Sequence, residues 1–249
     1  MRTLGIERGD AVLVHAALRR IGPVIGGADA VLWALRDAVG ADGTILGYTD
    51  WQSEDDIIEE PEMREHIPGF DPSASRAARD NGFFPEMLRT TPGALRSANP
   101  GASMAAIGGR AEWFTADHAL DYGYGPQSPL GKLVEVGGKT LLLGCPWDRM
   151  TLLHHAEHLA EFPNKRVRRY EAPLLIDGEV VWRWFEEFDT SSSPDGLPED
   201  YFIPVVEDFL ATGRGKRGTI GAAPSVLVEA KELVPFAVRW IERALRSAS

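Results

Sequence analysis

Short apolar runs and one amphipathic segment alternate along the first part of the chain. Asp10 to His15 is almost entirely apolar, as in a buried strand, and Ala28 to Val39 carries apolar residues at the spacing of a helix. Gly26-Gly27 precedes this helix, and the turn at 40–43 separates it from a second apolar run at 44–48. The order of strand, helix, turn and strand predicts a βαβ unit with two parallel strands.

The same pattern returns in the second half of the chain. Lys139 to Gly144 is a short apolar run, and Met150 to Glu161 follows it with helical spacing. Glu179 to Phe188 is rich in valine and aromatic residues, which favours a strand, and Leu233 to Arg246 is helical. Because the sequence has no internal repeat and no low-complexity linker, we expect one α/β domain over residues 1–249.

Two longer stretches fit neither pattern. Residues 51–72 are polar and interrupted by prolines, and residues 189–200 are rich in Ser, Pro, Asp and Gly. Long loops inside a compact domain are usually lids or binding loops. We therefore predict that both stretches are inserted loops that contact a substrate.

Composition narrows the class of partner. The 249 residues include 37 acids against 26 Lys plus Arg, a formal net charge of −11. This balance argues against nucleic acid or an anionic membrane as partner, because phosphates are neutralised by Lys and Arg, and it suits a cationic ligand. No apolar run approaches a membrane span or a signal-peptide core. The single cysteine, Cys145, fits a reducing compartment, so we expect a cytoplasmic protein.

The acidic residues are concentrated in one place. Between positions 50 and 65, eight acids stand against one base, Arg64: Asp50, Glu54, Asp55, Asp56, Glu59, Glu60, Glu62 and Glu65. They follow a predicted buried strand, and ligands of open α/β sheets bind beyond the carboxyl ends of strands. An acidic mouth there would concentrate a polycation. The alternative is that these charges only keep a loop solvated.

Histidines cluster in the segment TLLHHAEH at 151–158. On a helix His154 and His158 share one face, whereas His155 points elsewhere. Two imidazoles so spaced can share a zinc ion, although the segment is not H-E-x-x-H and lacks an evident third ligand. One histidine can instead serve as a general base, or the group can be surface histidines on a polar face.

Carboxylates that could support such a base end the predicted strand at 179–188. Glu187 and Asp189 fall on one face of that strand and Glu186 on the other. Beside aromatic residues they can bind a cation or orient a histidine. A half-exposed strand edge is the competing interpretation.

Other candidate motifs are weaker. The glycine turns at 26–27 and 40–43 can cradle phosphate but match no Walker A or G-x-G-x-x-G pattern. Ser103 lacks the G-x-S-x-G elbow of serine hydrolases. Cys145, which follows a strand, is either a nucleophile or a small core residue.

Five segments are distributed along nearly the whole chain: VHAAL at 14–18, VGADGT at 39–44, NPGASM at 99–104, YGPQSP at 124–129 and TLLHHAE at 151–157. In content and order they resemble the successive motifs of the aminoglycoside 3-N-acetyltransferases. The resemblance implies a single three-layer α/β domain, with a mixed sheet, flanking helices and inserted loops, distinct from the commoner small acetyltransferase fold. It also implies acetyl transfer from acetyl-CoA to the 3-amino group of a deoxystreptamine antibiotic, which gives resistance.

The resemblance also implies roles for individual residues. His154 matches the family's catalytic histidine and Glu187 the carboxylate that orients it, and no metal is implied. Coenzyme A contacts are implied for His15, Ala16, Ala17, Gly26, Gly27, Thr44 and Ser103. Antibiotic contacts are implied for Trp51, Asp71, Tyr122, Tyr124, Glu187 and Asp189.

Two departures from the family pattern are visible. Asn99 stands where the family usually has a histidine, and we expect it to donate or accept a hydrogen bond while His154 serves as the base. The chain begins almost at the turn 5–10, without the short helix that usually precedes it, and we expect this to lower stability. Transfer is expected to be direct, so that Cys145 is dispensable.

Three alternatives stay open from the sequence. An acetyltransferase for another amine would have little use for the acidic loop. A non-catalytic binder of cationic drugs would release no thiol from acetyl-CoA, and a zinc amidohydrolase would lose activity to a chelator. The sequence does not decide between a monomer and a homodimer, nor does it identify the antibiotics accepted.

Overall fold

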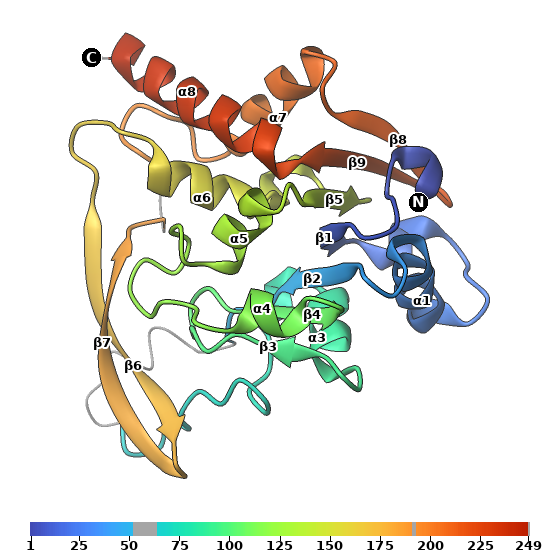
Figure 1. The fold of residues 1–249 in the computed structure, drawn as a ribbon. Coiled ribbons are helices and arrows are strands. Elements are labelled where there is room, and N and C mark those ends of the chain that lie inside the picture. The colour runs from blue at the N-terminus through green and yellow to red at the C-terminus, as the bar shows by residue number, and fades with distance from the viewer. Residues whose placement is uncertain (52–63, 191–192, 249) are drawn as a thin grey trace.

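The computed structural model describes residues 1–51, 64–190 and 193–248, and within them seven strands form one mixed sheet (Figure 1). Its strand order is β3-β4-β2-β1-β5-β9-β8. The strands span Ala11–Ala16 (β1), Thr44–Tyr48 (β2), Leu95–Arg96 (β3), Met104–Gly108 (β4), Lys139–Leu143 (β5), Lys216–Ile220 (β8) and Ala223–Glu229 (β9).

Three parallel strands form the centre of this sheet. β1 pairs in parallel with β2, with Leu13 opposite Leu46, and with β5, with His15 opposite Leu142. The remaining pairings are antiparallel. This confirms the predicted βαβ unit, whose helix is α1 (Gly27–Val39).

Helices cover both faces of the sheet, so the strands are apolar on both sides. One face packs against α1, α3 (Phe83–Thr90) and the short 3₁₀ helices η1 (Arg2–Leu4) and η2 (Leu18–Ile21). The other packs against α4 (Ala111–Thr115), α5 (Pro129–Glu135), α6 (Leu152–Leu159), α7 (Phe202–Ala211) and α8 (Ala230–Ala248). The result is three layers, helix, sheet and helix, as the resemblance implied.

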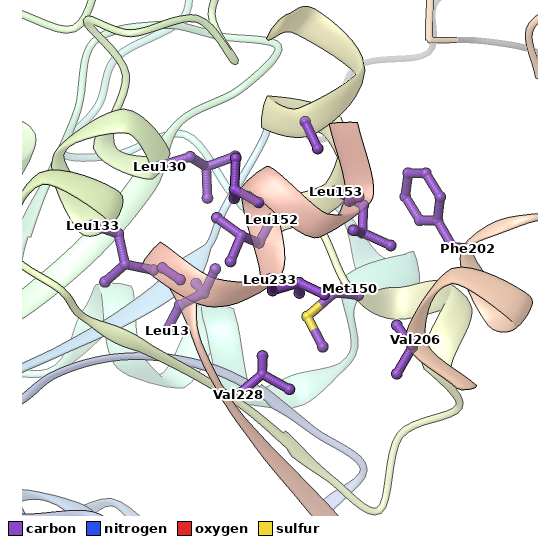
Figure 2. Close-up of a cluster of buried hydrophobic side chains, with 14 of the residues drawn as sticks. Leu13, Leu130, Leu133, Met150, Leu152, Leu153, Phe202, Val206, Val228 and Leu233 are labelled. Carbon is purple, nitrogen blue, oxygen red and sulfur yellow. The ribbon is translucent and has the colours of Figure 1, made fainter. Parts of the chain in front are cut away.

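The hydrophobic core between the sheet and helices α4 to α8 fixes the position of α6 (Figure 2). Met150, Leu152 and Leu153 are fully buried in it, together with Leu233 of α8 and Val206 of α7. Burying one such side chain contributes roughly 1.5–3 kcal/mol. The helix that carries the histidine cluster is therefore held rigidly against the body of the domain.

A two-stranded hairpin, β6 (Val167–Ile176) and β7 (Glu179–Phe188), stands beside the sheet (Figure 1). Phe70, Ala172, Leu174 and Phe185 form a small core beneath it. The Tyr122 N–H donates to the Glu186 carbonyl, which ties the hairpin to the loop before α5. The hairpin thereby faces the sheet across a gap that side chains line.

Most of the predicted elements agree with the structure. The helix predicted at 150–161 is shorter, Leu152–Leu159, because 3₁₀ helix η5 (Trp147–Arg149) precedes it and Pro163 follows, and the C-terminal helix is longer at both ends. Within the described part of the chain, no helix has the length and apolar character needed to cross a membrane.

Candidate functional site

The site forms at the carboxyl edge of the three parallel strands. β1, β2 and β5 all end at this edge, where the pairing aligns Ala16 with Leu143. The connection that follows β5 leads through η5 into α6, so it delivers His154 to the same edge. Ligands of open α/β sheets bind at such positions.

A cleft of about 680 Å³ lies between this edge and the hairpin. Aromatic and polar side chains from both walls line it, among them Tyr48, Asp50, Trp51 and Tyr124 from the sheet side and Tyr170, Trp182, Trp184 and Glu187 from the hairpin. Aromatic faces and carboxylates together suit a ligand that carries both rings and positive charge.

Acidic groups outnumber the basic ones in this cleft. Among the described residues, the lining acids are Asp50, Asp80, Glu171, Glu187 and Asp189, and the bases are Arg64, Arg168 and Arg169. Arg64 pairs with Glu171 at 2.8 Å and stacks on Trp182 at 3.9 Å from the ring centroid, and Arg169 pairs with Glu186 at 2.8 Å. The resulting field favours a cation.

His154 forms a short hydrogen bond with a buried carboxylate one helical turn away. Its Nδ1 lies 2.6 Å from Oε2 of Glu157, and the two side chains are 26% and 4% exposed. Since a carboxylate accepts, Nδ1 carries a proton, and in the neutral imidazole Nε2 has the lone pair, with no hydrogen-bond partner among the described residues. The ring lies 5.0 Å from that of Tyr124, which lines the cleft.

Glu187 is expected to orient His154, but in this structure its carboxylate is hydrogen-bonded elsewhere. Glu187 accepts hydrogen bonds from the backbone N–H groups of Gly123, at 2.5 Å, and Phe188, at 2.9 Å. These bonds turn it toward the loop before α5 and the cleft. The carboxylate bonded to the imidazole is Glu157, because residues three apart on a helix are neighbours.

Glu187 nevertheless has an altered proton affinity. Burial raises the pKa of its carboxyl to about 7 from the usual 4.5, although the backbone N–H of Gly123 and the nearby His154 oppose the rise. The group therefore titrates near neutral pH, and an ammonium ion beside it would stabilise its charged form.

We expect the Glu187→Gln variant to gain stability over the wild type as the pH rises, by about 2 kcal/mol between about pH 5 and pH 8. The unfolded carboxyl ionises near pH 4.5, whereas the folded one keeps its proton to about 7. Ionisation in this window therefore favours the unfolded state of the wild type, and glutamine does not titrate. Urea unfolding at both pH values measures the difference, and an equal offset at both would contradict the prediction.

The other histidines of the cluster are internal. His155 is 3% exposed, and its Nδ1 lies 2.7 Å from the Tyr124 carbonyl oxygen. Burial lowers the pKa of His158 to about 4, and its ring packs edge-on against Tyr122. In the part of the chain that the structure describes, no three His, Cys, Asp or Glu side chains come together as metal ligands.

The residues expected to contact coenzyme A fall into two groups. His15, Ala16 and Ala17 lie at the carboxyl edge, and the connection after them leads through η2 to Gly26 and Gly27 at the start of α1. The buried Nε2 of His15 has no hydrogen-bond partner among the described residues. Burial lowers the pKa of His15 to about 4, so its ring is neutral and can donate or accept one further bond.

Thr44 lies at the opposite edge of the sheet from this group, and Ser103 lies at the carboxyl edge but is buried. Thr44 pairs with Ala11 at the opposite edge of the sheet, where its hydroxyl accepts from the Arg110 N–H. Ser103 is fully buried and donates to the Thr49 carbonyl at 2.6 Å. The contacts of both residues are structural, and neither side chain lines the cleft.

The residues expected to contact the antibiotic also divide. Trp51, Tyr124, Glu187 and Asp189 line the cleft. Asp71 instead accepts from the backbone and hydroxyl of Ser73 in its own turn, and the Tyr122 hydroxyl donates to Glu186. Neither Asp71 nor Tyr122 is among the lining residues.

Two further expectations concern the loops. Of the eight clustered acids, Asp50 lines the cleft and Glu65 is exposed, whereas Glu54, Asp55, Asp56, Glu59, Glu60 and Glu62 lie outside the described residues.

The expected hydrogen bonding of Asn99 is confirmed. Its side chain, 1% exposed, donates to the carbonyls of Ala119 and Leu120 and accepts from the Ala102 N–H.

Sequence reasoning missed several residues of the site. Glu157 had a usable signal, its spacing of three from His154 on a predicted helix. Tyr48, at the end of β2, lines the cleft and its hydroxyl lies 2.6 Å from that of Tyr124. No local pattern marks Tyr201, whose hydroxyl donates to Glu157 from 44 residues away.

Comparison with known proteins identifies the family of the chain. The sequence model of a family described as aminoglycoside 3-N-acetyltransferase matches residues 13–242. Aminoglycoside N(3)-acetyltransferase III of Pseudomonas aeruginosa is 46% identical over 248 residues, which cover 97% of this chain and 90% of that protein. Aminoglycoside N(3)-acetyltransferase VIII of Streptomyces fradiae is 44% identical over 261 residues, which cover 100% and 91%.

Solved structures share the fold. AAC-IIIb in a binary complex with CoASH is 55% identical and superposes with a TM-score of 0.96, covering 98% of this chain and 94% of that one. AAC-VIa bound to sisomicin is 35% identical with a TM-score of 0.91, covering 97% and 94%. The three-layer fold implied by the sequence motifs is thereby confirmed, and the chain belongs to the aminoglycoside 3-N-acetyltransferase family.

Proposed function

We propose that this protein transfers the acetyl group of acetyl-CoA directly to the 3-amino group of a deoxystreptamine antibiotic, with His154 as general base. The observation that carries the proposal is the His154–Glu157 pair, whose imidazole is outside the cleft lining but lies 5.0 Å from the ring of Tyr124, a residue that lines the acidic, aromatic cleft. Relatives named for this activity, and neighbours with CoASH or sisomicin bound, support it. Acetylation of the antibiotic would confer resistance on a cell that makes the protein.

The cleft supplies the binding part of this function. An aminoglycoside carries several ammonium groups, which Glu187, Asp189 and Asp50 attract from different walls of the cleft. Trp51 and Tyr124 offer aromatic faces to sugar rings and cations. A site of this kind holds the ring so that one amine points at the base.

The His154–Glu157 pair supplies the proton transfer. An ammonium group cannot attack a thioester, so the 3-amino group first loses one proton to solvent. Nε2 of His154 then takes a second proton from the neutral amine as its nitrogen bonds to the acetyl carbonyl carbon. The carbon–sulfur bond then breaks, and the imidazolium returns the proton to the thiolate, which leaves as free coenzyme A. Glu157 holds the Nδ1 proton throughout and stabilises the imidazolium.

We propose that His15, Ala16, Ala17, Gly26 and Gly27 hold the coenzyme. The buried Nε2 of His15 has no hydrogen-bond partner among the described residues, so it can bond to a group of the coenzyme. Gly26 has a φ of 86° and Gly27 of 63°, and a Cβ at Gly27 would meet no atom within 4 Å, so this backbone is open to a ligand. Peptide N–H groups at a helix start suit phosphate.

Release of free thiol from acetyl-CoA over a panel of aminoglycosides tests the proposed reaction. We expect turnover with antibiotics that carry a free 3-amino group on deoxystreptamine, and none with the same antibiotic acetylated at that position. Turnover only with simple amines would assign another acetyltransferase activity. Tight antibiotic binding without thiol release would leave a cationic-drug binder.

We expect Cys145→Ala to keep kcat within about twofold of the wild type, because direct transfer forms no acetyl-enzyme. Burial raises the pKa of the Cys145 thiol to about 11, so thiolate is scarce at neutral pH. Thiol release gives kcat, and circular dichroism checks the fold. Loss of turnover in a folded Cys145→Ala protein would assign the thiol a covalent role.

A further inference from the structure

We propose that Tyr201 is a positioning residue of the acetyl transfer, whose hydroxyl holds Glu157 in the orientation that aligns His154. The inference rests on the proposed role of His154 as base. It concerns a residue far away in the sequence, at the start of α7, which follows the loop at 189–200.

Both oxygens of the Glu157 carboxylate have a fixed partner. The Tyr201 hydroxyl donates to Oε1, and Nδ1 of His154 lies 2.6 Å from Oε2. Tyr201 is 2% exposed and Glu157 3% exposed, so water does not replace either contact. A carboxylate that is hydrogen-bonded at both oxygens cannot rotate freely, so Glu157 holds the His154 imidazole in one orientation.

The hydroxyl is suited to this single role. Burial, and then the neighbouring Glu157 carboxylate, raise the pKa of Tyr201 well above its ordinary value. The phenol therefore keeps its proton and acts only as a donor. A buried carboxylate without that donor would lose part of the stabilisation of its charge.

Tyr201 is itself held from several sides. Its backbone N–H donates to the Pro198 carbonyl at 3.1 Å, and its ring stacks on Trp240 of α8 at 6.3 Å between centroids. The next residue, Phe202, places its ring edge-on to His154 at 5.0 Å. One dipeptide at the start of α7 thus contacts both members of the His154–Glu157 pair.

Tyr201→Phe tests the proposal, because it removes the hydroxyl and keeps the ring. We expect kcat to fall roughly tenfold, the size of effect for one hydrogen bond to a charged group, with KM for antibiotic and acetyl-CoA unchanged. The far-downfield proton resonance of the His154–Glu157 hydrogen bond should shift or broaden. In a Glu157→Gln background, Tyr201→Phe should have little further effect on kcat.

Asp208→Ala is the matched structural control. Asp208 lies on the same helix, and its Oδ2 accepts the 2.7 Å hydrogen bond from the Trp240 indole, which stacks on Tyr201. The variant therefore loosens the packing around Tyr201 but keeps the Tyr201 hydroxyl as a donor to Glu157. We expect a lower melting temperature for Asp208→Ala, with kcat and the downfield resonance unchanged.

Three results would overturn the role of Tyr201: unchanged kcat in Tyr201→Phe, a kcat loss of equal size in Asp208→Ala, or full additivity with Glu157→Gln. None of them touches the proposed function, which fails separately if His154→Ala keeps full turnover.

Discussion

Replacing His154 with alanine is expected to lower kcat by about 10²–10⁴-fold, the range that general-base catalysis usually contributes. The imidazole is the group that combines a fixed Nδ1 proton, an available Nε2 and a place beside the cleft. Antibiotic binding should change little, because the carboxylates that line the cleft remain. Steady-state thiol release gives kcat, and calorimetric titration gives the dissociation constant of the antibiotic.

His66→Ala is the matched control for this variant. His66 is an exposed histidine outside the cleft lining, so its loss should leave kcat unaltered. If His154→Ala turned over antibiotic as fast as His66→Ala, the proton would have to leave by another route and the base assignment would be withdrawn. Residual turnover that rises steeply with pH would agree with the assignment, because free amine then forms without help.

The elements that the sequence predicts correctly are those whose apolar pattern is local. β1, α1, β2 and β5 each bury a continuous face, and their spacing along the chain is enough to predict parallel pairing. β6 was missed because charges and a proline at 173 interrupt its alternation, and its strand exists through pairing with β7. The Asp177-Gly178 turn, with φ of 52° and 85°, was an available hairpin signal.

The residues of the site divide in the same way, into those that local sequence predicts and those that depend on tertiary packing. The motif identifies His154 and predicts Glu187, 33 residues further along, as its partner, whereas the carboxylate hydrogen-bonded to His154 in the structure is Glu157. The nearer acid, Glu157, needed only the helix phase. Thr44 shows a different limit of sequence reasoning. Its motif at 39–44 predicts a coenzyme contact, but Thr44 begins β2 at the edge of the sheet opposite the site. Which edge a residue reaches depends on strand order, and strand order is set by tertiary packing.

The different roles proposed for Glu157 and Glu187 have a measurable consequence. Glu157→Gln is expected to lower kcat by about 10²-fold with little change in KM for the antibiotic, because an amide neither stabilises the imidazolium nor fixes the Nδ1 proton. Glu157 is 3% exposed and not part of the cleft lining, so substrate does not reach it. Thiol release over a range of antibiotic concentrations separates kcat from KM.

Glu187→Gln makes the same chemical change at a carboxylate that lines the cleft, and it serves as the matched comparison. Its amide oxygen can replace one of the two carboxylate oxygens that accept from Gly123 and Phe188, whereas the other backbone donor loses its acceptor and a bound ammonium loses its counter-charge. We expect KM for the antibiotic to rise about tenfold and kcat to fall less than in Glu157→Gln. The reverse pattern, with kcat lost at Glu187 and only KM altered at Glu157, would restore Glu187 as the partner of His154.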